Sequence, residues 1–239
     1  QNRPPKFLYS KPTTKNTKMT ASDHFQVHPL VEGCQLELRA IRLGKQGFPR
    51  CEFFHPDDYQ SEQALKANFL HRARQLNRLG YTCYTPMNPV DKGYEPPLGK
   101  GTKAPGILKY TTMMVDVDRT DKLGKKNPAT DDELAQAEHL TNAISTYLEE
   151  IGWGTPHKIM SGNGYHLYYP IDLPNDEATS ALIETTLDTL AEKFNTDDFE
   201  VDTVVFDAAR ITKVIGTTAI KGEASEDRPH RRRRKPCRA

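Results

Sequence analysis

Polar and apolar residues alternate in the first patterned segment of the chain. Residues 35–41 (QLELRAI) follow the alternation of a half-buried strand. Between Ser61 and Leu79 apolar residues recur every three or four positions, which predicts a helix, and Gly80 follows as a natural C-terminal stop. Residues 81–87 then have the composition of a strand. The pattern predicts a β-α-β unit at the beginning of the fold.

A second group of elements follows a long loop. Residues 111–117 form an apolar run typical of a buried strand. Thr130 and Glu133 have the spacing of a capping box, which predicts a helix that begins there. Two further strands, 157–160 and 165–169, flank a Ser-Gly-Asn-Gly sequence that suits a tight hairpin.

The last predicted elements are a helix that opens at Pro174 and short strands near Val201 and over residues 211–215. The order β-α-β-β-α-β of the second group is that of an RRM-like, ferredoxin-like sheet. We therefore predict an α+β fold in which an N-terminal α/β lobe, about 34–109, packs against an RRM-like lobe, about 110–221.

The two ends of the chain are cationic and lack a hydrophobic period. Residues 1–22 contain lysine and arginine but no acidic residue, and we interpret them as a flexible basic arm before a domain that covers 23–221. Residues 222–239 are interpreted as a basic linker or tail. Its arginine-rich part, 231–235, could bind phosphate, but a solvated linker explains it equally well. The first residue, Gln1, favours a domain taken from a longer protein.

Glycine, proline and lysine dominate residues 91–106, which predicts a long loop. Loops of this length in compact domains are usually functional or disordered. Substrate contact and plain mobility are therefore both open.

Composition limits the class of protein. With 36% hydrophobic and 27% charged residues, the chain fits a polar cytoplasmic enzyme. It has no apolar run of the length that spans a membrane, and residues 1–22 lack the apolar segment of a signal peptide. The net charge of +1 does not exclude a nucleic-acid partner, because a basic groove can lie within a nearly neutral total.

Two acidic residues, Asp116 and Asp118, stand at the end of the apolar run. Side chains at i and i+2 of a strand point to the same face, so these two anions repel each other. A divalent cation is the usual way to stabilise such a pair in apolar surroundings. A strand end that emerges into solvent would explain the pair without a metal.

A histidine lies just inside the strand that follows the glycine-rich turn. The turn residues Ser161, Gly162 and Asn163 would let backbone N–H groups approach a phosphate, and His166 can donate a hydrogen bond to the same anion. An ordinary hairpin with a half-buried histidine is the simpler interpretation of this motif by itself.

A third acidic residue, Asp202, precedes several cations. One carboxylate beside a set of cations suits a site that holds metal and triphosphate together. Surface ion pairs are the alternative, and Asp207 could simply be the partner of Arg210. The candidate phosphate-binding residues of this segment are Arg210, Lys213, Thr217 and Lys221.

Together these three motifs resemble those of a known superfamily. Asp116-Val117-Asp118, Gly164-Tyr165-His166 and Val201-Asp202 are similar to the DxD, sxH and hydrophobic-Asp motifs of the archaeo-eukaryotic primase superfamily. Residues 202–216 resemble a segment of its plasmid- and phage-type primase-polymerases. The resemblance covers roughly residues 34–231.

The chain departs from that superfamily in two respects. Lys213 stands where many members have arginine. Some relatives carry a zinc-binding cysteine set, but the cysteines here are too widely spaced for one, so no zinc is expected and we interpret them as reduced thiols. They are Cys34, Cys51, Cys83 and Cys237.

The resemblance implies the catalytic domain of a DNA primase-polymerase. Asp116, Asp118 and Asp202 would bind two Mg²⁺ or Mn²⁺ ions that align a primer 3′-oxygen with the α-phosphate of a nucleotide. His166 would act with them in catalysis. The nucleotide-binding residues would be Ser161, Gly162, Asn163, His166, Arg210 and Lys213, with Thr217 and Lys221 as further candidates for nucleotide or template.

The same resemblance implies the partners. They are a single-stranded DNA template and primer, dNTP or NTP, and a helicase in the same polypeptide or in trans, in the replication of a plasmid, phage or mobile element. Two other classes stay open: a non-catalytic single-stranded nucleic-acid-binding initiator module, and a metal-dependent nuclease. The three acidic residues of the motifs argue against a non-catalytic initiator module. The cations and His166 favour transfer over cleavage.

Overall fold

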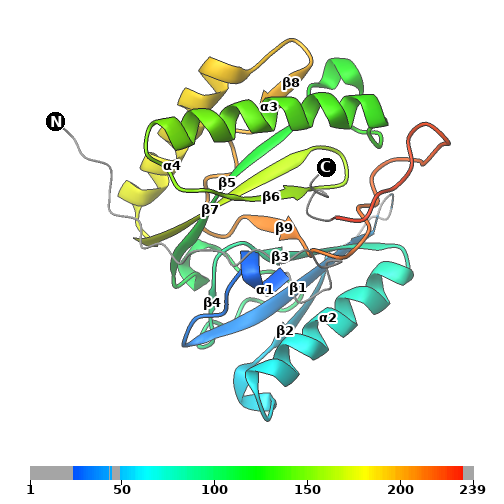
Figure 1. The fold of residues 1–239 in the computed structure, drawn as a ribbon. Helices are drawn as coiled ribbons and strands as arrows, with labels where there is room; N and C mark the ends of the chain where they lie inside the picture. Colours follow the sequence, from blue (N-terminus) through cyan, green and yellow to red (C-terminus); the bar gives the residue numbers. More distant parts are fainter. Residues whose placement is uncertain (1–23, 43, 45–48, 234–239) are drawn as a thin grey trace.

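The computed structural model describes residues 24–42, 44 and 49–233. Within them, two antiparallel sheets carry helices on their surfaces (Figure 1). Helix α2 packs on strands of the first sheet, and helices α3 and α4 pack on the second. The fold is therefore mixed α/β with antiparallel sheets, as the sequence predicts.

The first sheet has the strand order β2-β1-β3-β9, and the short strand β4 pairs with the beginning of β1. Helix α2 begins after Ser61, whose hydroxyl caps it by accepting from Ala64 N, and its buried face confirms the predicted periodicity. Strand β2 and the short helix α1 were not predicted. The elements are α1 His24–Val27, β1 Cys34–Arg42, β2 Arg50–Phe54, α2 Glu62–Arg78, β3 Tyr81–Pro86, β4 Val90–Asp91 and β9 Ile211–Lys213.

The second sheet has the strand order β6-β7-β5-β8. The predicted capping box is present, because the Thr130 hydroxyl accepts from Glu133 N while the Glu133 carboxylate accepts from Thr130 N. The elements are β5 Lys109–Arg119, α3 Asp131–Glu150, β6 His157–Met160, β7 Tyr165–Pro174, α4 Glu177–Phe194 and β8 Phe199–Val201. Short 3₁₀ helices lie at Pro56–Asp58, Ala104–Gly106 and Asp121–Leu123.

The strand predicted over residues 211–215 is present as β9, but it joins the first sheet. It pairs with β3, with Tyr84 opposite Lys213. The chain therefore crosses back to the N-terminal strands after β8, and a side chain of the first sheet can reach the acids of the second. This crossing builds the candidate site from both sheets.

The loop 91–106 is fixed to strand β1 at several points. Gln35 Nε2 donates to the carbonyl oxygens of Asp91 and Tyr94, at 3.0 and 2.9 Å. The buried Glu37 carboxylate accepts from Thr102 N at 2.8 Å. These hydrogen bonds satisfy buried polar groups of strand β1, so the loop is a packed part of the N-terminal lobe.

The segment that follows residue 222 is also packed on the fold. Arg228 and the buried Arg119 both bind the Glu133 carboxylate at the beginning of α3. Farther on, Arg231 pairs with Asp131 at 2.7 Å. Two arginines that the sequence placed in a basic tail, Arg228 and Arg231, therefore bind acids at the beginning of α3.

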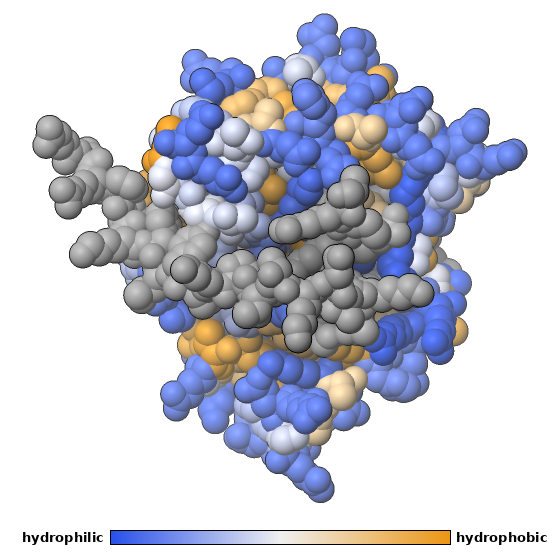
Figure 2. Space-filling model, in the orientation of Figure 1, coloured by the Kyte–Doolittle hydropathy of each residue, from blue (hydrophilic) through white to orange (hydrophobic). Residues whose placement is uncertain are grey.

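The remaining parts of the predicted arm and tail, residues 1–22 and 234–239, lie outside the described residues. None of the helices in the described part is long and apolar enough to cross a membrane. Hydrophilic residues cover most of the face shown in Figure 2. Cys34, Cys51 and Cys83 are free thiols, and Cys237 is not among the described residues.

Candidate active site

Asp116 on β5 lies directly opposite His166 on β7 in the register of the second sheet. The histidine Nε2 is 3.2 Å from Asp116 Oδ1, and the histidine side chain is almost fully buried. Burial by itself would raise the pKa of Asp116, but His166, with Lys213 and Lys221, outweighs it and lowers that pKa to about 2. Asp116 is therefore an anion at neutral pH.

Asp118 follows on the same face of β5. Its Oδ1 accepts from Arg119 N at 2.8 Å, and its Oδ2 lies 3.3 Å from Lys221 Nζ. Burial, together with the neighbouring anion Asp116, raises the pKa of Asp118, while Lys221 opposes that rise. The two carboxylates thus interact electrostatically, as the spacing predicted.

A second lysine approaches from the first sheet. Lys213 on β9 is half-buried, and its ammonium lies 5.9 Å from the centre of the Tyr84 ring. Burial lowers the pKa of Lys213 to about 8, although the nearby Asp116 opposes this effect. Two cations from outside the second sheet therefore balance the two acids of β5.

Asp202 lies beside the acid pair through the backbone. Its N–H donates to Asp116 O at 2.9 Å, immediately after the pairing of β8 with β5. Its side-chain Oδ1 accepts from Val204 N at 3.0 Å. Among the residues that the structure describes, no group of three or more His, Cys, Asp or Glu side chains converges as a metal cage.

The turn between β6 and β7 uses its polar groups within the fold. Ser161 Oγ accepts from Gly164 N at 3.2 Å, and Asn163 Oδ1 accepts from Ala129 N at 3.2 Å. A side chain at Gly164 would lie 2.2 Å from Val117 O, so only glycine lets the hairpin lie against the end of β5. These contacts shape the entry to His166.

Gly162 of the same turn is covered by the C-terminal segment. It has a φ of 108°, and a Cβ there would meet the Ala219 side chain at 2.5 Å. The Thr217 hydroxyl donates to Val214 O at 2.7 Å and is buried. Gly162 therefore offers only backbone here, and the Thr217 hydroxyl is used in its bond to Val214 O.

Arg210 pairs with Asp207, Nε to Oδ2 at 2.9 Å, and also donates to Val204 O on the turn after Asp202. This is the ion pair that the sequence left open. The contacts above connect six of the predicted residues, which are Asp116, Asp118, Asp202, His166, Lys213 and Lys221. Of the other five, Ser161, Asn163, Arg210 and Thr217 use their side chains in the bonds given above, and Gly162 contributes only backbone.

Three polar residues behind His166 were not predicted. His166 Nδ1 lies 2.6 Å from Tyr168 OH, which lies 2.7 Å from Thr212 Oγ1. The buried Arg233 donates to both hydroxyl groups. Tyr168 could have been found from the period of β7, which puts residues 166 and 168 on one face, but nothing in an arginine-rich run distinguishes Arg233.

Comparison with known proteins gives the fold. No protein-family model matches this sequence, and no curated protein does. The AEP domain of the cyanophage S-2L primase-polymerase matches with a TM-score of 0.50 at 12% identity, over 90% of this chain and 86% of that chain. This chain has an archaeo-eukaryotic primase fold. The fold expected from the motif resemblance is thereby confirmed.

Two further solved structures are similar to this chain. The polymerase domain of Mycobacterium tuberculosis Ligase D, in complex with DNA, has a TM-score of 0.48 at 15% identity, over 88% of this chain and 77% of that chain. The catalytic domain of primase RepB′, in complex with initiator DNA, has a TM-score of 0.43 at 11% identity, over 83% and 75% of the two chains.

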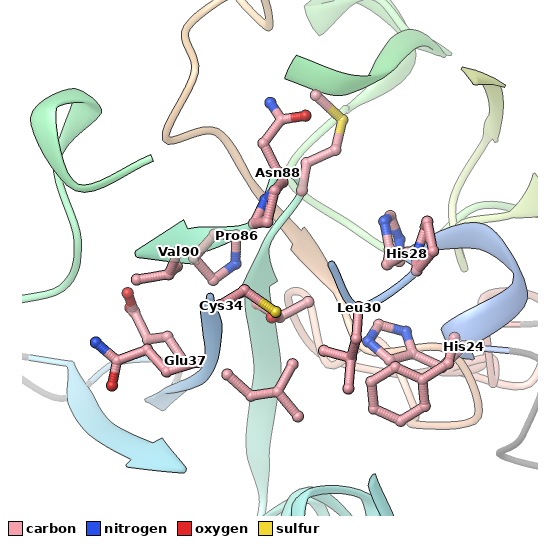
Figure 3. A pocket seen from close by; sticks show the side chains of 15 residues that line it. His24, His28, Leu30, Cys34, Glu37, Pro86, Asn88 and Val90 are labelled. Atoms are coloured by element: carbon pink, nitrogen blue, oxygen red, sulfur yellow. The ribbon is translucent and has the colours of Figure 1, made fainter. Parts of the chain in front are cut away.

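One small pocket is lined by neither Asp116 nor Asp118. Figure 3 shows its lining, which includes His24, His28, Cys34 and Asn88. Its volume of about 30 Å³ suffices for one or two water molecules and not for a nucleotide.

Proposed function

We propose that this chain is the catalytic domain of a template-directed nucleotidyltransferase with DNA primase and DNA polymerase activity. One observation carries the proposal: Asp116 and Asp118 share a strand end, with His166 facing Asp116 from the next strand. Lys213 and Lys221 supply positive charge at the same place. A pair of anions, a neutral donor and two cations suit the binding of metal and triphosphate together.

The second sheet is proposed as an RRM-like, ferredoxin-like catalytic sheet. Its element order is β-α-β-β-α-β, and its strand order is β6-β7-β5-β8. The two central strands, β5 and β7, carry Asp116 and His166. On this basis residues 34–109 supply the first lobe and residues 110–221 the catalytic lobe, with β9 returning to the first sheet.

The donor set fits hard divalent cations, because Asp116 and Asp118 offer carboxylate oxygens from one strand face. Asp202 would complete the set for Mg²⁺ or Mn²⁺ after its side chain leaves Val204 N. When bound, such ions supply charge neutralisation and alignment of a primer 3′-oxygen with the α-phosphate. This is the two-metal part of the proposal.

The chain's own residues would bind and orient the triphosphate. His166 Nε2 faces the acid pair and can donate to a phosphate oxygen there. The Lys221 ammonium pairs with Asp118. A metal ion bound to Asp118 would replace that contact and leave the ammonium available to the phosphates. Lys213 neutralises charge from the opposite sheet. Arg210 is a further phosphate candidate, since its side chain is 30% exposed.

Primer extension tests this function. The chain is incubated with single-stranded DNA, labelled nucleotides and Mg²⁺ or Mn²⁺, with and without a primer. We expect longer strands with a primer, and new strands in the primerless lanes if the chain also initiates. Binding without synthesis would instead support a nucleic-acid-binding module, and shortened DNA would support a nuclease.

A further inference from the structure

Arg233 lies at the end of the described chain and is fully buried behind His166. Its backbone N–H donates to Thr217 O at 2.9 Å, and its carbonyl oxygen accepts from Gly216 N at 3.1 Å. These bonds hold the segment against the residues that follow β9. The guanidinium is thereby inserted between the two sheets.

The guanidinium contacts the polar groups that support His166. It donates to Thr212 Oγ1 at 2.8 Å, and also to Tyr168 OH and to the carbonyl oxygen of Lys213. Its Nη2 lies 3.4 Å from His166 Nδ1. A buried arginine is costly unless its donors are paired, and here both terminal nitrogens of Arg233 donate to these groups.

The donors of Arg233 fix the direction of the other hydrogen bonds, because a guanidinium can only donate. Thr212 Oγ1 accepts a hydrogen bond from Arg233, and its own hydroxyl can donate one to Tyr168 OH, 2.7 Å away. Tyr168 OH then accepts from both Arg233 and Thr212. The single hydroxyl proton of Tyr168 is therefore donated in a hydrogen bond to His166 Nδ1, at 2.6 Å.

The opposite arrangement is less favourable. If His166 carried a proton on Nδ1, Tyr168 OH would have to accept it and donate to Thr212. The Thr212 proton would then have no acceptor among the described residues, and the Nδ1 proton would face the Arg233 Nη2 donor at 3.4 Å. An unmade buried hydrogen bond costs roughly 1–3 kcal/mol. The lone pair therefore belongs on Nδ1 and the proton on Nε2.

We propose that Arg233, acting through Thr212 and Tyr168, is a positioning residue that works together with the anion Asp116 to hold His166 as the Nε2–H tautomer, by keeping Nδ1 an acceptor. This directs a neutral hydrogen-bond donor to the place where a nucleotide phosphate would lie. The kinetic consequence rests on the proposed function, whereas the tautomer is a property of the folded chain alone. The arginine-rich segment is thus part of the site.

Nitrogen NMR tests the tautomer directly. The chain is labelled with ¹⁵N-histidine, and the His166 signals are assigned by their absence in His166→Gln. We expect the wild type to show protonated Nε2 and unprotonated Nδ1. In Arg233→Met the Tyr168 hydroxyl is free to turn and accept, so a population with protonated Nδ1 should appear. A protonated Nδ1 in the wild type would overturn the proposal. So would a folded Arg233→Met without any protonated Nδ1, because Asp116 alone would then select the tautomer.

Tyr168→Phe and the pair Thr212→Val and Thr212→Ser provide milder changes if Arg233→Met fails to fold. Tyr168→Phe should move the Nδ1 resonance toward that of a free imine nitrogen. Tyr147→Phe, a half-buried tyrosine on α3 that packs against Phe194, is the matched control and should leave it unchanged.

Nucleotide incorporation tests the kinetic consequence. We expect Tyr168→Phe and Thr212→Val to lower kcat about 10- to 100-fold with KM for DNA unchanged, and Thr212→Ser to restore most of the rate. If the wild type holds the Nε2–H tautomer but kcat is unchanged in Tyr168→Phe and Thr212→Val, the positioning role is overturned and the proposed function stands. Absence of synthesis by the wild type would contradict the proposed function, and the NMR result would still decide the tautomer.

Discussion

His166 on β7 and Asp116 on β5 face each other across the second sheet, with Nε2 3.2 Å from Oδ1. The contact joins two motifs that lie far apart in the sequence. It also leaves Asp116 as an anion, because the neighbouring positive groups lower its pKa to about 2 despite burial. A divalent cation and a phosphate would therefore meet an ionised oxygen and a donor at the same place.

Lys221→Met should weaken nucleotide binding. The ammonium lies 3.3 Å from Asp118 Oδ2 and is available to phosphates when a cation replaces it. Loss of one charged hydrogen bond should raise KM for the nucleotide about 10-fold with a smaller change in kcat. Steady-state incorporation kinetics measure this, with Lys109→Met as the control, since Lys109 pairs with Asp172 at 2.8 Å away from the site. An unchanged KM would remove Lys221 from the nucleotide site.

The local elements could be predicted from the sequence because their signals are local. The helix starts at Ser61 and Thr130 depend on side chains within one turn, and both are confirmed. Strand β2 was missed because it is an edge strand in which only Phe54 is buried, so its hydrophobic pattern is weak.

The distant pairings of the site could not be predicted in the same way. The three residues of β9 carry no signal for their partner β3, and that pairing decides which sheet supplies Lys213. Arg233 was hidden in a run of arginines, where burial follows only from the bonds of residues 216–217 to that segment. Asp116 and Asp118 were singled out because their spacing within one strand fixes the face they share, and His166 because it follows a glycine-rich turn.

Glu133→Gln should destabilise the fold and loosen the C-terminal segment. The Glu133 carboxylate accepts from Arg228 and from Arg119, whose side chain is fully buried. Leaving Arg119 without its anion should cost about 3 kcal/mol in the free energy of unfolding. Denaturant unfolding measures the loss, and hydrogen exchange should show reduced protection over residues 219–233. Full protection in the variant would contradict the role given to this triad.

Stability should fall as the pH is lowered below neutral. Burial, with a smaller effect of Arg233, lowers the pKa of His24 to about 3, against 6.5 for an unperturbed histidine. Between these values the unfolded chain binds a proton that the folded chain does not, so the free energy of unfolding decreases by up to about 1.4 kcal/mol per pH unit for this group. His28 has its pKa lowered in the same direction by burial.

Denaturant unfolding at a series of pH values measures this slope. His24→Phe should reduce it, and His139→Gln, which changes an exposed histidine on α3, should not. Equal slopes in all three proteins would show that His24 titrates normally in the folded state.

The central claim is that Asp116 and Asp118 form the catalytic centre of a nucleotidyltransferase. The most direct measurement is template-directed incorporation of a labelled nucleotide by the wild type, Asp116→Asn and the control Asp172→Asn, an exposed acid paired with Lys109. The account predicts metal-dependent strand growth by the wild type and the control, and a loss of about 10³-fold or more in Asp116→Asn with the fold intact. Equal incorporation by Asp116→Asn, or none by the wild type with either metal despite binding to the template, would contradict it.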